Sequence, residues 1–438
     1  MAQAISHKHI WSLAWPMILS NLSVPLLGLI DTAILGHLSQ PRYLAAVALG
    51  ASMLTFIFWA FGFLRMGTTS FVAQAYGAND TQQYRQAVVQ SLVIALLSGI
   101  ILLLIHWPLI NTILWFIQPG ETLFTLAREY TQIRLFSAPA VMINYVVMGY
   151  FLGIQQTRTP LLIAIVINSI NIALDYLFIV VLNENSRGAA WASVIADYSG
   201  LLLGLYFVHQ KLPLKQLLNE SWKNIDTHSL QRIITVNRHL FVRTASLLFV
   251  FLFIASQGAK QGEVILAANA ILLQLLSVVS YGLDGFAHAT ETLVGHSAGK
   301  RSIQYFWATC RKTTYWSLWT ALIMTALFAL LKAPIIYWMT DIDAVAQYVH
   351  IYYNWLLLLP IVSVWAYQLD GVFIGLGESV ILQHCMLISL LGVFLPLWYL
   401  SLPLANHGLW LSLIAFNGAR GITLGWCLWK KENVFIKK

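Results

Sequence analysis

Charged residues are scarce in this chain, because Asp, Glu, Lys and Arg together make up 10% of its 438 residues. Soluble domains carry about 25% charged residues, which keep their surface compatible with water. Hydrophobic residues instead reach 59%, and the mean hydropathy is +0.72. These values exclude a soluble protein and predict an integral membrane protein whose surface faces lipid.

Cysteine is rare as well, and the three that are present, Cys310, Cys385 and Cys427, show no C-x-x-C or Cys/His spacing. This pattern argues against a disulfide framework and a zinc site, so we expect all three to be packing residues. No ligand spacing is found among His106, His288, His296 and His384, and neither a P-loop nor a Gly-x-Ser-x-Gly motif occurs. We therefore expect no enzyme, no ATP-driven pump, no cofactor and no structural metal.

Long apolar runs are abundant. One crossing of the bilayer needs about 20 apolar residues, and turn-forming sequences such as residues 76–80, 118–120, 183–187 and 299–302 separate the runs. The first run is too long for a signal peptide and is expected to remain as the first span. The predicted fold is an all-α membrane protein of twelve spans, near 10–35, 44–72, 86–106, 123–153, 160–182, 188–208, 230–256, 264–292, 310–331, 345–375, 380–402 and 407–429.

The formal net charge of +8 is explained by topology. Most Lys and Arg residues between the expected spans lie on the side of the two termini, for example Lys211, Lys300, Arg301 and Lys430. The positive-inside rule then places both termini in the cytoplasm of a multi-pass protein of the cytoplasmic (inner) membrane. No nucleic-acid partner is needed to explain the basic charge.

The chain contains an internal repeat. A polar connection at 210–229 separates two predicted lobes of six spans each, residues 1–209 and 230–438. Six spans per repeat leave both halves in the same orientation, so we expect a pseudo-twofold axis along the membrane normal and a central cavity, as in transporters. A shift of 222 residues places Thr68, Val72, Gly149 and Gly153 on Thr290, Val294, Gly371 and Gly375.

Ionisable side chains inside spans are costly in hydrocarbon and mark candidate functional sites. Asp31 lies in the first span, and Asn168, Asn171 and Asp175 share one stripe of the fifth. On the sixth span Ser193 and Asp197 are four residues apart and share a face. The alternative for Asp31 is a carboxylate at the lipid interface, and the alternative for the polar stripe is hydrogen bonding between helices.

Asp31 and Asp175 suggest an ion site. Burial and like charge both disfavour ionised carboxylates, so such a pair can take up and release protons near neutral pH. The same oxygens would also suit a hard cation such as Na⁺, and the residues alone leave both ions open. The repeat places Asp31 opposite Phe253 and Asp175 opposite Leu397, so the site belongs to the N-terminal half.

Other features have two interpretations each. Asp284, Asp370 and the membrane-edge Glu291 either line a separate cavity wall that attracts cations or form structural pairs with Arg243 or Arg420. Pro16 removes a backbone hydrogen bond before Asp31, and Pro25 weakens the same helix. The result is either a bend that couples Asp31 to the cavity or a static kink.

The chain resembles the multidrug and toxic compound extrusion (MATE) transporters, and within them the DinF-like branch. The run from Trp15-Pro16 to Leu29-Ile-Asp31-Thr-Ala-Ile-Leu-Gly-His37 looks like the first helix of that family. The segments 237–244, 281–295 and 370–375 are similar to DinF-branch segments. The resemblance covers nearly the whole chain and implies a proton- or sodium-coupled exporter with two six-helix lobes.

The resemblance also implies roles for particular residues. The cation site of the family corresponds to Asp31, Asn171, Asp175 and Ser193, where relatives often have Thr. Asp197 is outside the matched pattern, and a further carboxylate there would favour protons. Pro16 corresponds to the bend of the first helix, which is proposed to respond to protonation at Asp31.

We therefore expect a monomeric antiporter that contacts membrane lipids and exports small organic, cationic and amphipathic compounds against inward H⁺, or Na⁺ at Asp31, Asn171, Asp175 and Ser193. A lipid-linked oligosaccharide or lipid flippase of the same superfamily is the alternative. It would be expected to line its cavity with several arginines for pyrophosphate, whereas few arginines lie within these spans.

Overall fold

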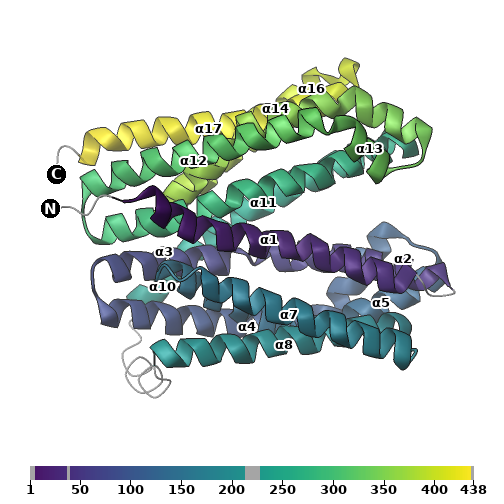
Figure 1. Cartoon of the computed structure of the whole chain (residues 1–438), viewed down its shortest axis with the longest axis horizontal. Coiled ribbons are helices and arrows are strands. Elements are labelled where there is room, and N and C mark those ends of the chain that lie inside the picture. The colour runs from purple at the N-terminus through teal and green to yellow at the C-terminus, as the bar shows by residue number, and fades with distance from the viewer. Residues whose placement is uncertain (1–4, 37–39, 213–226, 436–438) are drawn as a thin grey trace. The chain divides into compact units, whose positions relative to one another are not determined.

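A computed structural model describes residues 5–36, 40–212 and 227–435. Residues 213–226, most of the connection expected at 210–229, lie outside the described residues. The described chain is helical almost throughout and contains no strand, which confirms the predicted all-α fold (Figure 1). It divides into two compact units, Leu19–Ile234 and Met1–Ile18 with Thr235–Lys438.

The unit Leu19–Ile234 takes in most of the N-terminal half of the chain. The unit begins inside the first helix, α1 (His7–Gly36). It continues with α2 (Pro41–Ala60), α3 (Phe63–Gly77), α4 (Thr81–Ile117), α5 (Glu121–Leu135), α6 (Ala138–Gly153), α7 (Arg158–Asp175), the π-helix η1 (Tyr176–Val181) and α8 (Asn185–Lys211).

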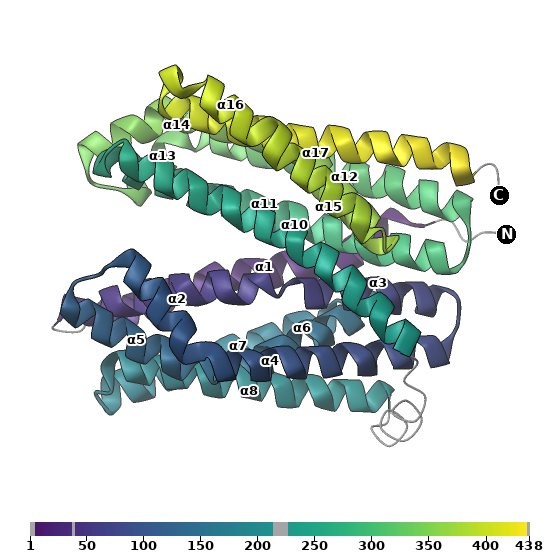
Figure 2. The ribbon, with the colours of Figure 1, turned by 180° about the vertical axis from the view of Figure 1, so that it is seen from behind.

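The other unit contains the C-terminal half, and Figure 2 brings α10 and α15 of this half into view. Its elements are α10 (Thr227–Lys260), α11 (Glu263–Gly299), α12 (Ile303–Leu330), α13 (Lys332–Met339), α14 (Asp343–Gly375), α15 (Ser379–Leu387), the π-helix η2 (Ile388–Phe394), α16 (Leu395–Leu400), the 3₁₀ turn η3 (Leu402–Leu404) and α17 (Asn406–Phe435).

Two helices belong to both units. The divisions fall between Ile18 and Leu19 within α1, and between Ile234 and Thr235 within α10. In α1 the division comes two residues after Pro16, which is buried. The helix thus changes from one packing environment to the other directly after the residue that lacks a backbone donor.

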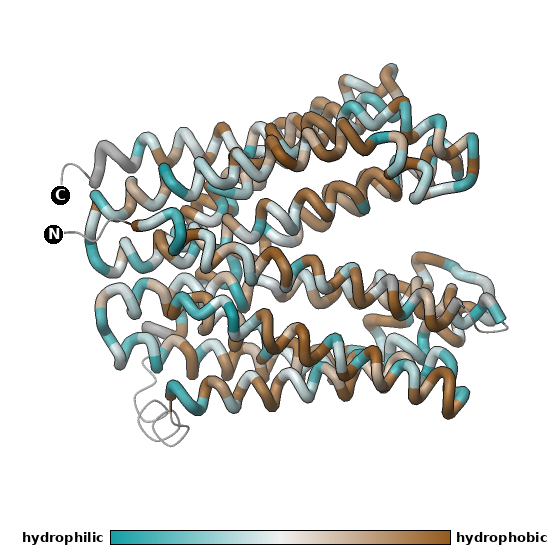
Figure 3. The backbone as a smooth tube through the Cα atoms, in the orientation of Figure 1, coloured by the Kyte–Doolittle hydropathy of each residue, from teal (hydrophilic) through white to brown (hydrophobic). Residues whose placement is uncertain are grey.

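The helices are long and apolar enough for a multi-pass membrane protein. Ten described helices could cross a bilayer, or eleven when α5 and α6, which meet at 51°, count as one bent span. The twelfth expected span corresponds to α17, which has 30 residues but is not among these candidates. Many large hydrophobic side chains face outward, including Leu104, Leu330 and Trp338, as lipid requires. Hydrophobic stretches run through the middle parts of the helices, and hydrophilic residues are more frequent at the turns that join them (Figure 3).

The turn sequences end helices through local chemistry. Asp80 precedes α4 and accepts a hydrogen bond from the Gln83 amide at 2.8 Å, and Ser302 accepts from Tyr305 N before α12 in the same way. Gln118, Asn183 and Arg301 adopt the left-handed backbone conformation at the turns after α4, η1 and α11. These turns match four breaks that the sequence indicates.

The repeated glycines make equivalent contacts in the two units. A side chain at Gly149 on α6 would lie 2.6 Å from Arg65 O on α3, and one at Gly371 on α14 would lie 2.5 Å from Ala287 O on α11. Arg65 and Ala287 are themselves related by the 222-residue shift. Only glycine permits backbones to approach this closely, so the repeat preserves one helix-packing contact in each unit.

Candidate functional site

Asp31 on α1 and Asp175 at the end of α7 come together. Their carboxyl groups lie within hydrogen-bonding reach of each other. Asp175 is 1% exposed, and the Oδ1 atoms of both residues are buried with no hydrogen-bond partner among the described residues. An ionised carboxylate only accepts hydrogen bonds, so a bond between the two groups requires a proton on one of them.

Asn171 and Ser193 fix the position of Asp175. The Asn171 amide is oriented so that its nitrogen donates to Asp175 Oδ2 at 3.0 Å and its oxygen accepts from Ser193 Oγ and Ser193 N at 3.1 and 3.2 Å. Asn171 is buried and lies one helical turn before Asp175 on α7. The amide therefore links α7 to α8 and presents a donor to the carboxyl group.

Arg134 on α5 is a member of this site that we did not predict from the sequence. Its Nη1 donates to Asp197 Oδ2 on α8 at 2.7 Å and to Ser137 Oγ at 2.7 Å. It also hydrogen-bonds Tyr130 and interacts electrostatically with Asp31 and Asp175. Arg134 could have been found by the criterion that identified Asp31 and Asp175, because it too is an ionisable residue inside an apolar run.

Asp197 and Asn168 have other partners than the carboxyl pair. Asp197 is held by Arg134, and its backbone oxygen accepts from Asn144 Nδ2 at 3.2 Å. Asn168 donates to Ser23 O on α1 at 3.4 Å. Asn168 thus ties α7 to the part of α1 that carries Asp31, while Asp197 balances the charge of Arg134.

The helix that carries Asp175 changes its winding at that residue. α7 ends at Asp175, and the π-helix η1 begins at Tyr176. π-Helical segments are rare and occur frequently at functional sites. A second one, η2, follows α15 in the other unit, so the irregularity recurs in both halves of the chain.

Pro16 lies in the part of α1 that packs within the other unit. Ile10, Leu13 and Ala14 contact Phe286, Ala289 and Leu293 of α11 there. Lys312 Nζ donates to Ile5 O at 2.5 Å, which anchors the backbone just before α1 to α12. α1 continues as one helix through Pro16 to Gly36, so its two ends are held by different units.

The repeat position of Asp31 has a different environment. Phe253 packs edge-on against Trp398 with 4.8 Å between ring centroids, and against Phe394 at 5.5 Å. Trp398 adjoins Leu397, the position equivalent to Asp175. The equivalent location in the C-terminal unit is therefore filled by aromatic rings.

The acids of the C-terminal unit lie in a separate charge cluster. Asp370 Oδ2 on α14 accepts from Arg243 Nη2 on α10 and from Arg420 Nη2 on α17, the latter at 2.6 Å. Both structural pairings that the sequence left open are therefore present. Asp284 interacts electrostatically with Arg243, and Glu291 is 3.6 Å from His288 Nδ1.

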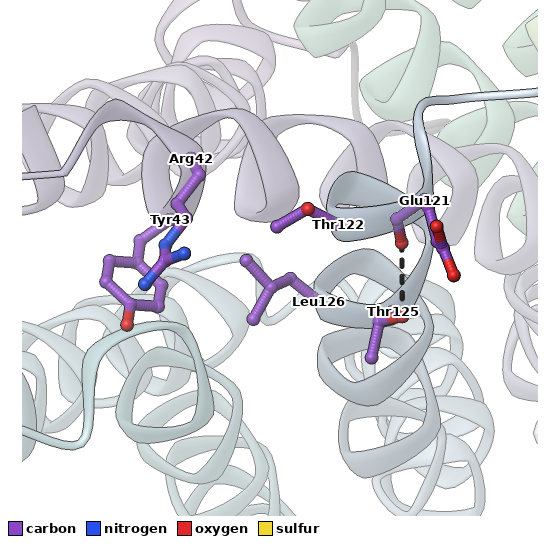
Figure 4. Close-up of a pocket in the computed structure, with 6 residues that line it drawn as sticks. All are labelled: Arg42, Tyr43, Glu121, Thr122, Thr125 and Leu126. Carbon is purple, nitrogen blue, oxygen red and sulfur yellow. Dashed lines mark hydrogen bonds between the residues drawn. The ribbon is translucent and has the colours of Figure 1, made fainter.

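A surface depression of about 420 Å³ lies in the N-terminal unit, where α2 and α5 begin (Figure 4). The guanidinium carbon of Arg42 lies 5.2 Å from the ring centroid of Tyr43. Thr125 Oγ1 donates a hydrogen bond to Glu121 O at 3.1 Å. None of its lining residues belongs to the carboxyl site. The depression is therefore distinct from the Asp31–Asp175 pair.

Comparison with known proteins identifies the family. A family model described as MatE matches residues 16–177 and 240–400. DNA damage-inducible protein F of Escherichia coli (strain K12) is 39% identical over 432 residues, which is 98% of this chain and 93% of that protein. The probable multidrug resistance protein NorM of Acinetobacter baylyi is 25% identical over 95% of this chain and 92% of its own length.

A solved structure shares the fold. It is described as the outward-facing conformation of a multidrug resistance MATE family transporter of the MOP superfamily, and it matches with a TM-score of 0.89 at 21% identity over 98% of this chain and 96% of that one. The chain therefore belongs to the MatE family and is a multi-pass membrane transporter rather than an enzyme.

Proposed function

We propose that this transporter is an antiporter that exports small organic compounds and takes up protons at Asp31 and Asp175. The observation that carries the proposal is the contact between the carboxyl groups of the half-buried Asp31 and the buried Asp175. A shared hydrogen bond between them requires one proton, and its loss leaves two like charges in a poorly solvated place. The pair is thus suited to alternate between a protonated and a deprotonated state.

The surroundings favour a proton over Na⁺. A Na⁺ site at Asp31, Asn171, Asp175 and Ser193 needs oxygen atoms directed at the ion. The Asn171 oxygen is instead occupied by Ser193, and its nitrogen faces Asp175. Arg134 adds a positive charge that acts on both acids. We therefore propose H⁺ as the coupling ion, with Na⁺ as the alternative to be tested.

Coupling is proposed to run through α1. Asp31 is carried by the part of α1 that belongs to one unit, and Pro16 lies in the part that belongs to the other. Protonation removes charge from the Asp31 site and favours a bent α1, which shrinks the cavity of the N-terminal lobe and expels the substrate. This requires only that the proton binds one conformation better than the other.

The substrate class follows from charge and from the relatives. Deprotonated Asp31 and Asp175 attract cations, and their protonation removes that attraction. One relative is a probable multidrug resistance protein, so we propose organic, cationic and amphipathic substrates. A flippase for pyrophosphate-linked lipids is disfavoured because Arg134, Arg243 and Arg420 are each paired with a carboxylate.

The proposal extends to placement in the cell. We propose that the protein acts as a monomer in the cytoplasmic (inner) membrane with both termini in the cytoplasm, where basic residues gather. The repeat halves, residues 1–209 and 230–438, form the two lobes that open alternately to either side.

Asp31→Asn tests the function. Expressed in a drug-sensitive bacterial host, this variant is expected to insert and fold but to confer no resistance to ethidium, because the amide cannot be deprotonated. The matched control is Asp341→Asn, which changes an exposed acid in a loop and retains resistance. Wild-type resistance in Asp31→Asn at equal protein level would contradict the proposal.

A further inference from the structure

Two of the three cysteines are in contact. Cys385 on α15 and Cys427 on α17 are 42 positions apart in the chain, and their Sγ atoms are 3.9 Å apart. The third cysteine, Cys310 on α12, is buried in a different place and packs with Phe306 and Val372. The sequence led us to expect three packing residues, and in the structure all three thiols are free, with those of Cys385 and Cys427 next to each other.

The two thiols differ in access. Cys385 is buried and lies within hydrogen-bonding reach of the Thr423 hydroxyl, one turn before Cys427 on α17. Cys427 is partly exposed, next to the outward-facing Trp426. Trp429 and Lys430 follow, a composition typical of the interface between membrane and water. A small uncharged oxidant can therefore reach Cys427 first.

We propose that Cys385 and Cys427 form a reversible disulfide when the protein meets hydrogen peroxide. The Cys427 thiolate attacks one peroxide oxygen, the O–O bond breaks, and Cys427 becomes a sulfenic acid with release of hydroxide. The Cys385 thiol gives its proton to that hydroxide, which forms the first water, and the resulting Cys385 thiolate attacks the Cys427 sulfur. The S–O bond breaks, and the hydroxide that leaves takes up the proton that Cys427 lost when it ionised, which forms the second water. Two thiols are oxidised by two electrons, and one peroxide is reduced to two waters.

The geometry needs only a small change. A disulfide has a sulfur–sulfur bond of about 2.05 Å, so the two sulfur atoms must approach each other from 3.9 Å. Rotation of the partly exposed Cys427 side chain supplies part of this movement. Cys310 belongs to a separate packing cluster and serves as an internal control for nonspecific oxidation.

The disulfide would tie together two helices that carry different features. α17 carries Arg420, which binds Asp370, and α15 continues into the π-helix η2. A covalent link across them limits any relative movement of α15 and α17 during the transport cycle. Oxidation is therefore expected to slow export several-fold, and a reductant is expected to restore the rate. This effect on transport rests on the proposed export activity, whereas formation of the disulfide does not.

Peptide mass spectrometry tests the bond. Purified full-length protein is treated with hydrogen peroxide, its free thiols are blocked, and it is digested. A linked peptide pair containing Cys385 and Cys427 is expected in the wild type and in Cys310→Ser, and dithiothreitol should remove it. Its absence, a bond to Cys310, or linkage only between two copies of the chain would overturn the proposal.

Transport in proteoliposomes tests the consequence. Peroxide should slow ethidium export by the wild type and by Cys310→Ser, and leave Cys427→Ser unchanged. If the linked peptide forms while export keeps its rate, the control of transport is overturned. If untreated protein exports nothing, the proposed function fails instead, and the peptide result still decides the site.

Discussion

Arg134 Nη1 lies 2.7 Å from Asp197 Oδ2, and this ion pair joins α5 to α8 beside the Asp31–Asp175 site. Both side chains are largely buried, with 16% exposure each. The guanidinium also donates to Ser137 Oγ. Asp197 is therefore committed to balancing an arginine, and we assign it a structural role next to the carboxyl pair.

Arg134→Met and Asp197→Leu test this role by a double-mutant cycle. Each single change leaves a buried charge without its partner and is expected to destabilise the protein by about 3–5 kcal/mol. The double variant should lose less than the sum of the two, with a coupling of about 0.5–3 kcal/mol. Thermal unfolding of the four proteins in one detergent measures the cycle, and strictly additive losses would show that the pair has no energetic role.

Ser193→Ala tests the support of Asn171. The change removes one hydrogen bond to the Asn171 oxygen, a loss of about 1 kcal/mol, which corresponds to about a fivefold effect. We expect slower export from Ser193→Ala, whereas Ser193→Thr keeps the hydroxyl and should export normally. Ethidium export from proteoliposomes measures both variants. Equal export rates in the Ala and Thr variants would show that the hydroxyl group at position 193 has no role in transport.

Asp370→Asn separates the two groups of acids. It leaves Arg243 and Arg420 buried without the carboxylate that both contact, so we expect a loss of stability of about 3–5 kcal/mol. Asp31→Asn should leave stability nearly unchanged while abolishing export. Melting temperatures and membrane yields compare the two variants. If Asp370→Asn is as stable as the wild type, groups other than Asp370 must balance the buried charges of Arg243 and Arg420.

Pro16→Ala tests the proposed bend. The alanine restores a backbone donor that favours a straight α1, since proline in a helix interior is unfavourable by about 3 kcal/mol. We expect folded protein with slower export. Pro108→Ala makes the same change in α4 at an exposed position, within a single unit, and should export normally. Equal export by both variants would assign Pro16 a static role.

Several features of the fold were predictable because their signals are local or periodic. Apolar runs longer than a bilayer crossing indicated the helices, and a constant shift related Gly149 to Gly371, which make equivalent close contacts. Asp31 and Asp175 were identifiable because carboxylates are costly inside apolar segments. Each of these inferences uses spacing within one helix or one repeat.

Other features depend on which helices become neighbours, which spacing does not reveal. The Arg134–Asp197 pair joins residues 63 positions apart, and the Cys385–Cys427 contact joins two helices of the C-terminal unit. The division of α1 after Ile18 reflects packing of its first turns against α11. These relationships arise from tertiary packing, so a single sequence gives no direct signal for them.

The central claim is that protons bound at Asp31 and Asp175 drive export. Its most direct test is ethidium transport by inverted membrane vesicles that contain the wild type or Asp31→Asn, energised in turn by an imposed pH gradient and an imposed Na⁺ gradient. We predict that the pH gradient alone drives transport in the wild type and that neither gradient does so in Asp31→Asn. Transport driven by Na⁺ without a pH gradient, or transport by Asp31→Asn driven by the pH gradient, would contradict the account.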